Sequence, residues 1–298
     1  MLLPLLKTMR PRQWTKNIFC FVALVFDGKL FHLSPLVITS LGFILLCLIS
    51  GTVYIINDLV DVEKDRQHPQ KRARPIASGQ LNQQVATISA VLLPLILIPL
   101  SFRLDIGFGF LMLGYLILQL AYSFRLKNMV IIDVMAIAAG FVIRVAAGVV
   151  LVEVTRFSPW LYVCVTLGAL FLGFGKRRQE LVLALETGNQ RTRSILSEYS
   201  IPLLDEIMAV VVASLVMAYS LYTFFAPNLP ENNVMMITIP LVLYGVFRYM
   251  YLIHIRGDGG DPSEIILQDR PLQITGLLYT ITVVAILYQT QLQQLLGL

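Results

Sequence analysis

Charged residues are scarce in this chain, and their scarcity decides its class. Only 14% of the 298 residues are Asp, Glu, Lys or Arg, whereas 57% are hydrophobic and the mean hydropathy is +0.75. A typical soluble globular domain carries about 25% charged residues, so a water-soluble fold is excluded. We therefore expect the lipid bilayer to surround most of this chain.

Cysteine is also rare, and its spacing excludes a metal-binding or disulfide framework. Cys20, Cys47 and Cys164 lie in apolar segments, without the short spacing that metal and redox sites need. We expect them to behave as small buried hydrophobic side chains. No small-residue cleavage pattern follows the basic amino-terminal segment, so we expect the first apolar segment to be retained rather than removed as a signal peptide.

Apolar segments near the length needed to cross a hydrocarbon core of about 30 Å recur along the whole sequence. They predict an all-α integral membrane protein, a bundle of nine transmembrane helices that forms a single domain over residues 1–298. No soluble domain interrupts the pattern, because the polar connections are short. The nine predicted spans are residues 17–33, 36–57, 82–103, 105–124, 130–151, 159–175, 202–225, 233–253 and 272–292.

The distribution of Lys and Arg predicts the orientation of the spans. Nineteen of the 23 basic residues fall in alternate connections, starting with the amino-terminal segment, whereas Lys29, Arg103 and Arg156 lie on the opposite side and Arg144 lies inside a span. Basic connections stay in the cytoplasm. We expect a multi-pass protein of the cell membrane with a cytoplasmic amino terminus. The net charge of +5 then reflects topology, so we expect no nucleic-acid partner.

Four oxygen-bearing side chains follow the second predicted span. If residues 51–65 form one helix, Asn57, Asp58, Asp61 and Asp65 share an arc of about 100°. Mg²⁺ prefers such hard oxygen ligands and keeps positions for water and phosphate. We therefore predict Mg²⁺ as a cofactor, with Asn57, Asp61 and Asp65 as ligands and Asp58 in support.

A rigid basic loop, residues 68–79, comes directly after these acids and includes Lys71 and Arg74. Carboxylates that bind a metal beside cations that bind phosphate oxygens describe a site for a metal diphosphate. Two plainer interpretations remain open. The acids could pair with Lys64 or Arg66, and the cations could reflect only the positive-inside rule.

The acids and the basic loop together resemble the first Asp-rich motif of the UbiA superfamily of intramembrane prenyltransferases, whose nine-span layout also agrees. Within that superfamily, the likeness to the decaprenyl-phosphate phosphoribosyltransferase subgroup extends over nearly the whole chain. The residues that carry the superfamily motif are Asn57, Asp58, Asp61, Asp65, Lys71, Arg72, Arg74, Pro75, Ser78 and Gly79. The stretches that carry the subgroup likeness are 10–17, 122–127, 175–181 and 268–270.

The sequence departs from ordinary members of the superfamily at one position. Members that transfer a prenyl group to an aromatic ring resemble one another in a second motif of the type Asp-x-x-x-Asp. Here residues 176–180 read Lys-Arg-Arg-Gln-Glu. This departure weakens the case for a second metal-binding pair and favours a more anionic ligand. A surface ion pair between Lys176 and Glu180, four residues apart, is the alternative interpretation.

Two charged residues lie within the fifth predicted span. Asp133 and Arg144 are eleven residues apart, which returns them to within about 20° of the same helical face, so both should point into the bundle. An intramembrane Arg is a functional candidate, here for an anionic head group. The alternative is a structural ion pair with an acid on a neighbouring helix. Gly140 and Gly148 are expected to permit close helix packing.

The glycine-containing stretch 257–264 fits neither a phosphate loop nor a calcium loop. We expect Asp261 to cap a helix that begins at Pro262. Asp269 and Arg270 then stand at the entrance to the ninth span, where contact with a ribose or a phosphate is an open alternative.

The resemblance implies transfer of the 5-phosphoribosyl group of phosphoribosyl diphosphate (PRPP) to a polyprenyl phosphate of decaprenyl type in the bilayer, at a cytoplasmic-side cavity. The chemistry agrees, because the departing diphosphate needs a Lewis acid and the acceptor phosphate is already an anion that needs no general base. The predicted catalytic residues are Asp58, Asp61 and Lys127. The predicted substrate contacts are Lys16, Lys71, Arg74, Tyr122, Lys127, Arg144, Lys176 and Arg177.

Two other functions compete with this interpretation. An aromatic prenyltransferase that uses polyprenyl diphosphate would share the fold and the Mg²⁺ motif, but the missing second Asp pair weighs against it. A transporter would carry charged or polar groups along a continuous path through several spans, whereas nearly all the charge here lies at one face. The sequence leaves the oligomeric state and the length of the lipid open.

Overall fold

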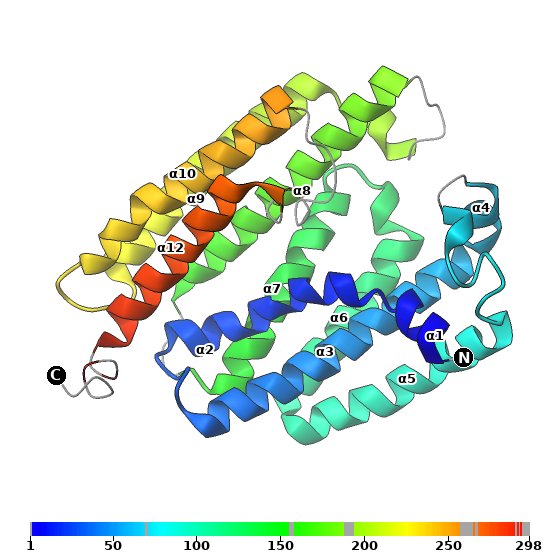
Figure 1. The fold of residues 1–298 in the computed structure, drawn as a ribbon, viewed down its shortest axis with the longest axis horizontal. Coiled ribbons are helices and arrows are strands. Elements are labelled where there is room, and N and C mark those ends of the chain that lie inside the picture. The colour runs from blue at the N-terminus through cyan, green and yellow to red at the C-terminus, as the bar shows by residue number, and fades with distance from the viewer. Residues whose placement is uncertain are drawn as a thin grey trace. The chain divides into compact units, whose positions relative to one another are not determined.

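The computed structural model describes residues 2–68, 71–154, 158–187, 194–256, 265, 268–289, 291 and 293. Every regular element among these residues is helical, and none is a strand. In chain order they are α1 (Leu2–Thr8), η1 (Pro11–Phe21), α2 (Val22–Phe26), α3 (Leu33–Val60), α4 (Val62–Gln67), η2 (Lys71–Ala73), α5 (Gln83–Leu104), α6 (Ile106–Phe124), η3 (Leu126–Asn128), α7 (Ile132–Val152), α8 (Pro159–Thr187), η4 (Ser194–Glu198), α9 (Ile201–Phe225), η5 (Val234–Thr238), α10 (Ile239–Tyr251), η6 (Leu252–Arg256) and α12 (Arg270–Leu287) (Figure 1).

The helices form two compact units. The first comprises residues 1–125 and 143–154, and the second comprises residues 126–142 and 155–298. Helix α7 therefore contributes its first half to the second unit and its remaining residues to the first.

In the first unit, α3 packs against α5, α6 and η1 around a core that includes Leu46 and Phe108. The backbone of α7 approaches η1 closely at Gly148, where an added Cβ would meet the carbonyl oxygen of Cys20 at 1.9 Å. The prediction that Gly148 permits close packing is confirmed. Only a residue without a Cβ fits this contact.

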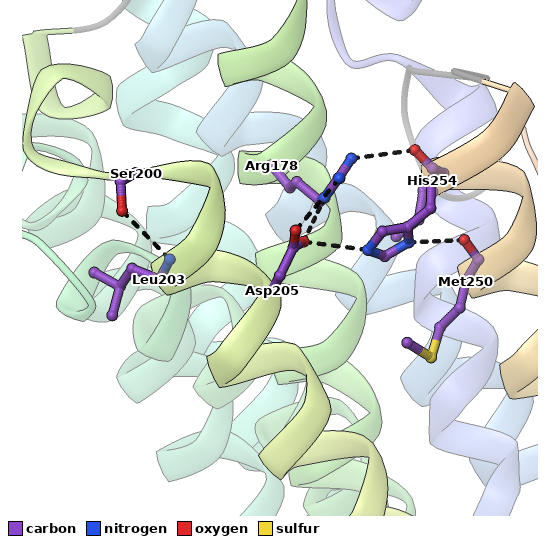
Figure 2. Close-up of polar contacts among 7 residues, drawn as sticks. Arg178, Ser200, Leu203, Asp205, Met250 and His254 are labelled. Atoms are coloured by element: carbon purple, nitrogen blue, oxygen red, sulfur yellow. Dashed lines mark hydrogen bonds and ion pairs between the residues drawn. The ribbon is translucent and has the colours of Figure 1, made fainter.

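In the second unit, α8 packs along α9, and α10 packs against α12. The core includes Phe171 and Met208. Helix α9 begins where the Ser200 hydroxyl accepts a hydrogen bond from Leu203 N, at 3.3 Å, as Figure 2 shows. Such a side-chain cap satisfies one of the free N–H groups of a first turn.

Eight helices are long and apolar enough to cross a membrane among the described residues, and they coincide with the second to ninth predicted spans. The first predicted span, 17–33, does not form one long α-helix. It contains the end of the 3₁₀ helix η1 and the short helix α2. The prediction of an all-helical membrane protein is therefore confirmed, and a ninth crossing stays a prediction. The predicted cap at Asp261 lies outside the described residues.

The prediction of one helix over residues 51–65 is wrong. Helix α3 ends at Val60, Asp61 has a ψ of 7°, and α4 begins at Val62. The hydrogen bonds Asp61 N to Asn57 O, 3.0 Å, and Asp65 N to Asp61 O, 2.8 Å, nevertheless continue across the junction. An Asp inside a helix competes with the backbone for hydrogen bonds, which favours such a break. The predicted stop at Pro69 lies outside the described residues.

Candidate active site

A compact cluster of two buried carboxylates and two arginines lies at the junction of α3 and α4. Arg10 Nη2 donates to Asp58 Oδ1 at 2.6 Å, and Arg74 Nη1 donates to the same oxygen at 3.1 Å and to Asp65 Oδ2 at 2.6 Å. The two Asp side chains are 3% and 4% exposed, against 32% for Arg10 and 28% for Arg74. The arginines thus lie between the acids and solvent. We call these four residues the acid–arginine cluster.

Arg10 was not among the predicted site residues, although it begins the stretch 10–17. Its backbone is left-handed, with φ 53°, directly before Pro11. Its guanidinium also lies over the Tyr54 ring, 4.8 Å from the centroid. A non-glycine residue with positive φ stores strain that surrounding contacts must offset. The contacts with Asp58 and Tyr54 hold Arg10 in this conformation.

Asn57 and Asp61 are partly exposed beside the cluster. Among the described residues, the Asp61 carboxylate has no hydrogen bond or ion pair. The alternative pairing of the acids with Arg66 is not seen, because Arg66 binds Glu63 at 2.7 Å.

The side chains at the junction of α3 and α4 include the predicted Mg²⁺ ligands Asn57, Asp61 and Asp65. No three His, Cys, Asp or Glu side chains gather closely enough to hold a metal ion within the described part of the chain. However, one guanidinium nitrogen already spans Asp58 and Asp65, so a cation fits between these two carboxylates. Oxygen donors of this kind are those that Mg²⁺ prefers. The donors present are therefore of the chemical kind that Mg²⁺ takes, and Arg74 engages two of them.

The remaining predicted phosphate contacts are distributed over several elements. In the first unit, Lys16 lies in η1 and Lys71 in η2, and Tyr122 lies near the end of α6. In the second unit, Lys127 lies in η3 and Lys176 in α8. Lys71 is exposed and the other four are partly buried.

Arg144 lies in a buried polar cluster of the first unit. Its Nε donates to Asn17 Oδ1 and its Nη2 to the Tyr115 hydroxyl, both at 2.8 Å. Asn17 in turn donates to Ser50 Oγ at 3.1 Å and to Cys47 Sγ at 3.3 Å. The prediction that Asp133 and Arg144 both point inward is confirmed, since they are 0% and 8% exposed.

Arg177 is fully buried in the second unit. Its Nε contacts Asp133 Oδ2 and its Nη1 contacts Glu180 Oε2, each at 2.5 Å. Glu180 therefore pairs with Arg177, three residues away. The Tyr199 hydroxyl donates to Asp133 Oδ1 at 2.8 Å and accepts from Ile131 N at 2.6 Å. Burial raises the pKa of Tyr199 to about 12, so this hydroxyl stays a neutral donor.

A second network, which sequence reasoning missed, joins three helices (Figure 2). Arg178 Nε donates to Asp205 Oδ1 at 2.5 Å, and its Nη1 donates to Ile253 O at 3.3 Å. His254 Nε2 lies 3.2 Å from the same Asp205 oxygen, and Nδ1 lies 2.8 Å from Met250 O. The π-helix η6, which carries His254, is a rare geometry often found at functional sites. Of these residues, only Arg178 lies in a stretch singled out from the sequence, residues 175–181.

Asp269 has a structural role at the start of α12. Its carboxylate accepts from Leu272 N at 3.0 Å and pairs with Arg248, whose Nη2 lies 2.8 Å from Oδ2. The helix cap and the ion pair use both oxygens. A ribose or phosphate contact at Asp269 stays a prediction.

These features define the class of the molecule as a multi-pass membrane protein with acids and arginines gathered at helix ends. Residues 17–265 match the UbiA prenyltransferase family. The chain belongs to that family and is a transferase. Curated relatives include decaprenyl-phosphate phosphoribosyltransferases of Mycolicibacterium smegmatis, 33% identical over 95% of this chain and 92% of the relative, and of Corynebacterium glutamicum, 32% identical over 95% and 86%.

Solved structures share the fold. A UbiA homologue from Archaeoglobus fulgidus bound to DMAPP and Mg²⁺ has a TM-score of 0.70 at 18% identity, covering 95% of this chain and 98% of that chain. A structure of digeranylgeranylglyceryl phosphate synthase has a TM-score of 0.66 at 16% identity, covering 96% of both chains. The similarity at this level of identity establishes the fold of the present chain.

Proposed function

We propose that the protein transfers the 5-phosphoribosyl group of PRPP to a polyprenyl phosphate of decaprenyl type and releases diphosphate, which makes it a glycosyltransferase. The names of the relatives support this reaction. The observation that carries the site is the acid–arginine cluster at the junction of α3 and α4, where Asp58 and Asp65 are buried beneath Arg10 and Arg74. This cluster joins carboxylates that could bind a metal to arginines that could bind phosphate, all within one hydrogen-bonded group.

The proposed metal ligands are Asn57, Asp61 and Asp65. Mg²⁺, when bound, would neutralise the charge that develops on the departing diphosphate. Asp58 forms an ion pair with Arg10 and would support the metal site without being a ligand itself. The acceptor phosphate is an anion at neutral pH, so no residue is assigned as a general base.

The Lys and Arg residues of the proposed phosphate contacts would act as point charges or bidentate donors, and the Tyr122 hydroxyl would act as a single donor. Lys71 and Arg74 would bind the donor beside the metal ligands. Arg144, within its polar cluster, would attract the phosphate of the lipid. Arg177 would reach a substrate only after it exchanges its bonds with Asp133 and Glu180. Lys16, Tyr122, Lys127 and Lys176 complete the proposed set.

We further propose that the chain acts as one polytopic domain of nine spans in the cell membrane, with the amino terminus and a substrate cavity on the cytoplasmic side. The family match supports one domain, because it runs through both units. The asymmetric distribution of Lys and Arg supports the orientation.

PRPP is favoured over a prenyl diphosphate by the chemistry at the second half of α8. Acids in this region are engaged by arginines: Glu180 by Arg177, and Asp205 by Arg178. Residues 176–180 hold one acid among three cations, where members that transfer a prenyl group to an aromatic ring have a second pair of Asp residues. An aromatic prenyltransferase that uses polyprenyl diphosphate is the second candidate, because the Archaeoglobus structure holds the prenyl diphosphate DMAPP.

One experiment separates the candidates. Membranes that contain the protein are incubated with labelled PRPP and polyprenyl phosphate, with and without Mg²⁺, beside membranes that contain Asp61→Ala. We expect Mg²⁺-dependent label in the lipid extract of the wild type alone. Prenylation of an aromatic acceptor by polyprenyl diphosphate, without sugar transfer, would replace the proposal with the second candidate. Label carried unchanged into vesicles would indicate a transporter.

A further inference from the structure

Arg74 occupies the position of a cation between two buried carboxylates. A single nitrogen, Nη1, is 3.1 Å from Asp58 Oδ1 and 2.6 Å from Asp65 Oδ2. The two Asp side chains are almost completely buried, while Arg74 keeps 28% of its side-chain surface exposed. The guanidinium therefore shields the acid pair from solvent and is itself accessible.

We propose that Arg74 and the metal compete for Asp65. Arg74 neutralises this carboxylate when no metal is bound, leaves it when the metal arrives, and then binds the diphosphate of the donor. The inference rests on the proposed function, which takes Asp65 as a metal ligand and Arg74 as a phosphate contact.

Electrostatics supports an exchange rather than simultaneous binding. A carboxylate removed from water is stable only while a cation balances its charge. A guanidinium and a divalent cation at contact distance from the same carboxylate repel each other strongly in a poorly solvated site. Metal binding must therefore break the pair between Arg74 and Asp65. The released guanidinium needs another anion, and a diphosphate offers oxygens that match its geometry.

The residues next to Arg74 and Asp65 have contacts that favour this exchange. Asp61, which has no partner among the described residues, offers an open carboxylate to the arriving metal. Arg10 contacts Asp58 and the Tyr54 ring, so Asp58 keeps a counter-ion after Arg74 has moved. Only Asp65 changes its partner.

The exchange couples two binding events. When the metal binds alone, the ion pair between Arg74 and Asp65 breaks and Arg74 gains no new anion. When the metal binds with diphosphate, Arg74 pairs with the diphosphate instead. Metal and diphosphate should therefore tighten each other's binding by the same factor, as linkage requires. The protein would bind the metal with the donor and hold free metal weakly.

Equilibrium dialysis of the purified protein in detergent tests the competition, with Mn²⁺ as the probe. Arg74→Gln is compared with the wild type and with Arg66→Gln, which removes the same charge from the exposed pair with Glu63. We expect Arg74→Gln to bind Mn²⁺ alone about 5- to 150-fold more tightly, the usual range of coupling between sites. Arg66→Gln should match the wild type. Unchanged or weaker binding by Arg74→Gln would overturn the inference.

The second arm adds methylenediphosphonate, a diphosphate that is not cleaved, at a fixed free Mn²⁺ concentration. Wild-type protein should bind Mn²⁺ more tightly with the diphosphonate, and Arg74→Gln should lose most of this gain. An equal gain in both proteins contradicts the exchange.

A measurement on the unaltered protein covers the case in which Arg74→Gln does not fold. Phenylglyoxal, which modifies arginine, is applied briefly and the modified residues are quantified by mass spectrometry. Mn²⁺ alone should raise the reactivity of Arg74, and Mn²⁺ with diphosphonate should protect it, while Arg66 stays constant. Constant or falling reactivity of Arg74 with Mn²⁺ alone argues against release from Asp65.

The inference and the proposed function fail in different ways. If the wild type transfers the sugar in a metal-dependent way and Arg74→Gln has unchanged Mn²⁺ affinity, the competition is ruled out and the proposed function stands. Metal-independent transfer, or no transfer at all, together with no Mn²⁺ binding by any variant, removes the function.

Discussion

Asp58 and Asp65 have the same chemistry but different surroundings, and the difference underlies the roles proposed for them. Asp58 contacts two arginines, of which Arg10 has a strained backbone conformation and lies over Tyr54. The Asp65 carboxylate pairs with Arg74. In the proposed exchange, Asp58 therefore keeps Arg10 as a partner, whereas Asp65 changes its partner.

Asp61→Ala tests the proposed metal ligand that is least constrained by partners. Loss of a group that only orients a metal ligand usually lowers metal affinity or activity by about 10- to 100-fold. Loss of a ligand itself should therefore lower the rate of transfer by about 100-fold or more. The remaining activity should lose its dependence on Mg²⁺, measured as label in the lipid extract. Glu63→Gln, an exposed residue of the same segment, is the matched control and should keep activity. Full activity of Asp61→Ala would rule out its role.

Arg144→Gln tests the buried polar cluster of the first unit. If Arg144 attracts the lipid phosphate, the KM for polyprenyl phosphate should rise about tenfold or more, because a charge-assisted hydrogen bond contributes about 1.5–3 kcal/mol. The KM for PRPP should change little. Arg144→Lys should recover part of the effect. An equal rise in both KM values, with a lower unfolding temperature, would instead indicate a purely structural role beside Asn17 and Tyr115.

Residue types at the site were predictable, but their partners were not. The sequence spacing placed Asp58, Asp61 and Asp65 at one helix end. It did not indicate that Arg10 would reach Asp58, because that contact joins residues 48 positions apart. The same limit applies to Asp205, whose partners Arg178 and His254 come from other helices.

At the scale of elements, long apolar segments predicted α3 and the later spans well, because burial in lipid depends mainly on length and composition. The 3₁₀ helix η1 and the break at Asp61 were missed. The 3₁₀ helix η1 makes a tertiary contact, the close approach of Gly148 to Cys20, and the break is favoured by the local competition of the Asp61 side chain with the backbone. Hydrophobic periodicity carries no information about either effect.

The contact between α7 and η1 gives a prediction of its own. Gly148→Ala would place a Cβ against the Cys20 carbonyl oxygen, and neither backbone can move without disturbing its helix. We expect the free energy of unfolding to fall by about 1–3 kcal/mol, the usual cost of overpacking. Gly114→Ala in α6, where a Cβ meets nothing within 4 Å, is the control and should be neutral or stabilising. Unfolding temperatures of the two variants in detergent check this difference.

The network of Arg178, Asp205 and His254 fixes the second half of α8 against α9 and η6. Asp205→Asn should weaken it and lower the unfolding temperature by a few degrees, because Asp205 is partly exposed and such pairs contribute about 0–1 kcal/mol. The adjacent exposed Glu206→Gln is the control. A lower kcat in Asp205→Asn with an unchanged unfolding temperature would show that the network positions α8 for catalysis rather than stabilising it.

At the scale of the whole molecule, orientation is the feature that most needs a direct measurement. Gln80 and Asn232 are exposed residues in connections that the distribution of basic residues predicts to lie on opposite sides. An impermeant maleimide should label Gln80→Cys only in inside-out vesicles and Asn232→Cys only in intact cells. Cys20 and Cys47 are buried and Cys164 in α8 is partly buried, so labelling of the unaltered protein gives the background. The reverse pattern would move the site to the other face.

Composition was sufficient to predict the membrane class, since 57% hydrophobic residues leave no alternative to a bilayer. The acid motif was sufficient to suggest the family, to which residues 17–265 belong. The division into two units was not predicted, because α7 is one continuous helix and gives no sign in its sequence of being shared.

Arg10 lies far from Asp58 in the sequence but shields it in the structure, which has a practical consequence for purification. Proteolytic loss of the segment up to Arg10 would remove the shortest ion pair of a carboxylate that is only 3% exposed. Mass spectrometry should therefore show that residues 2–10 are intact before any metal titration.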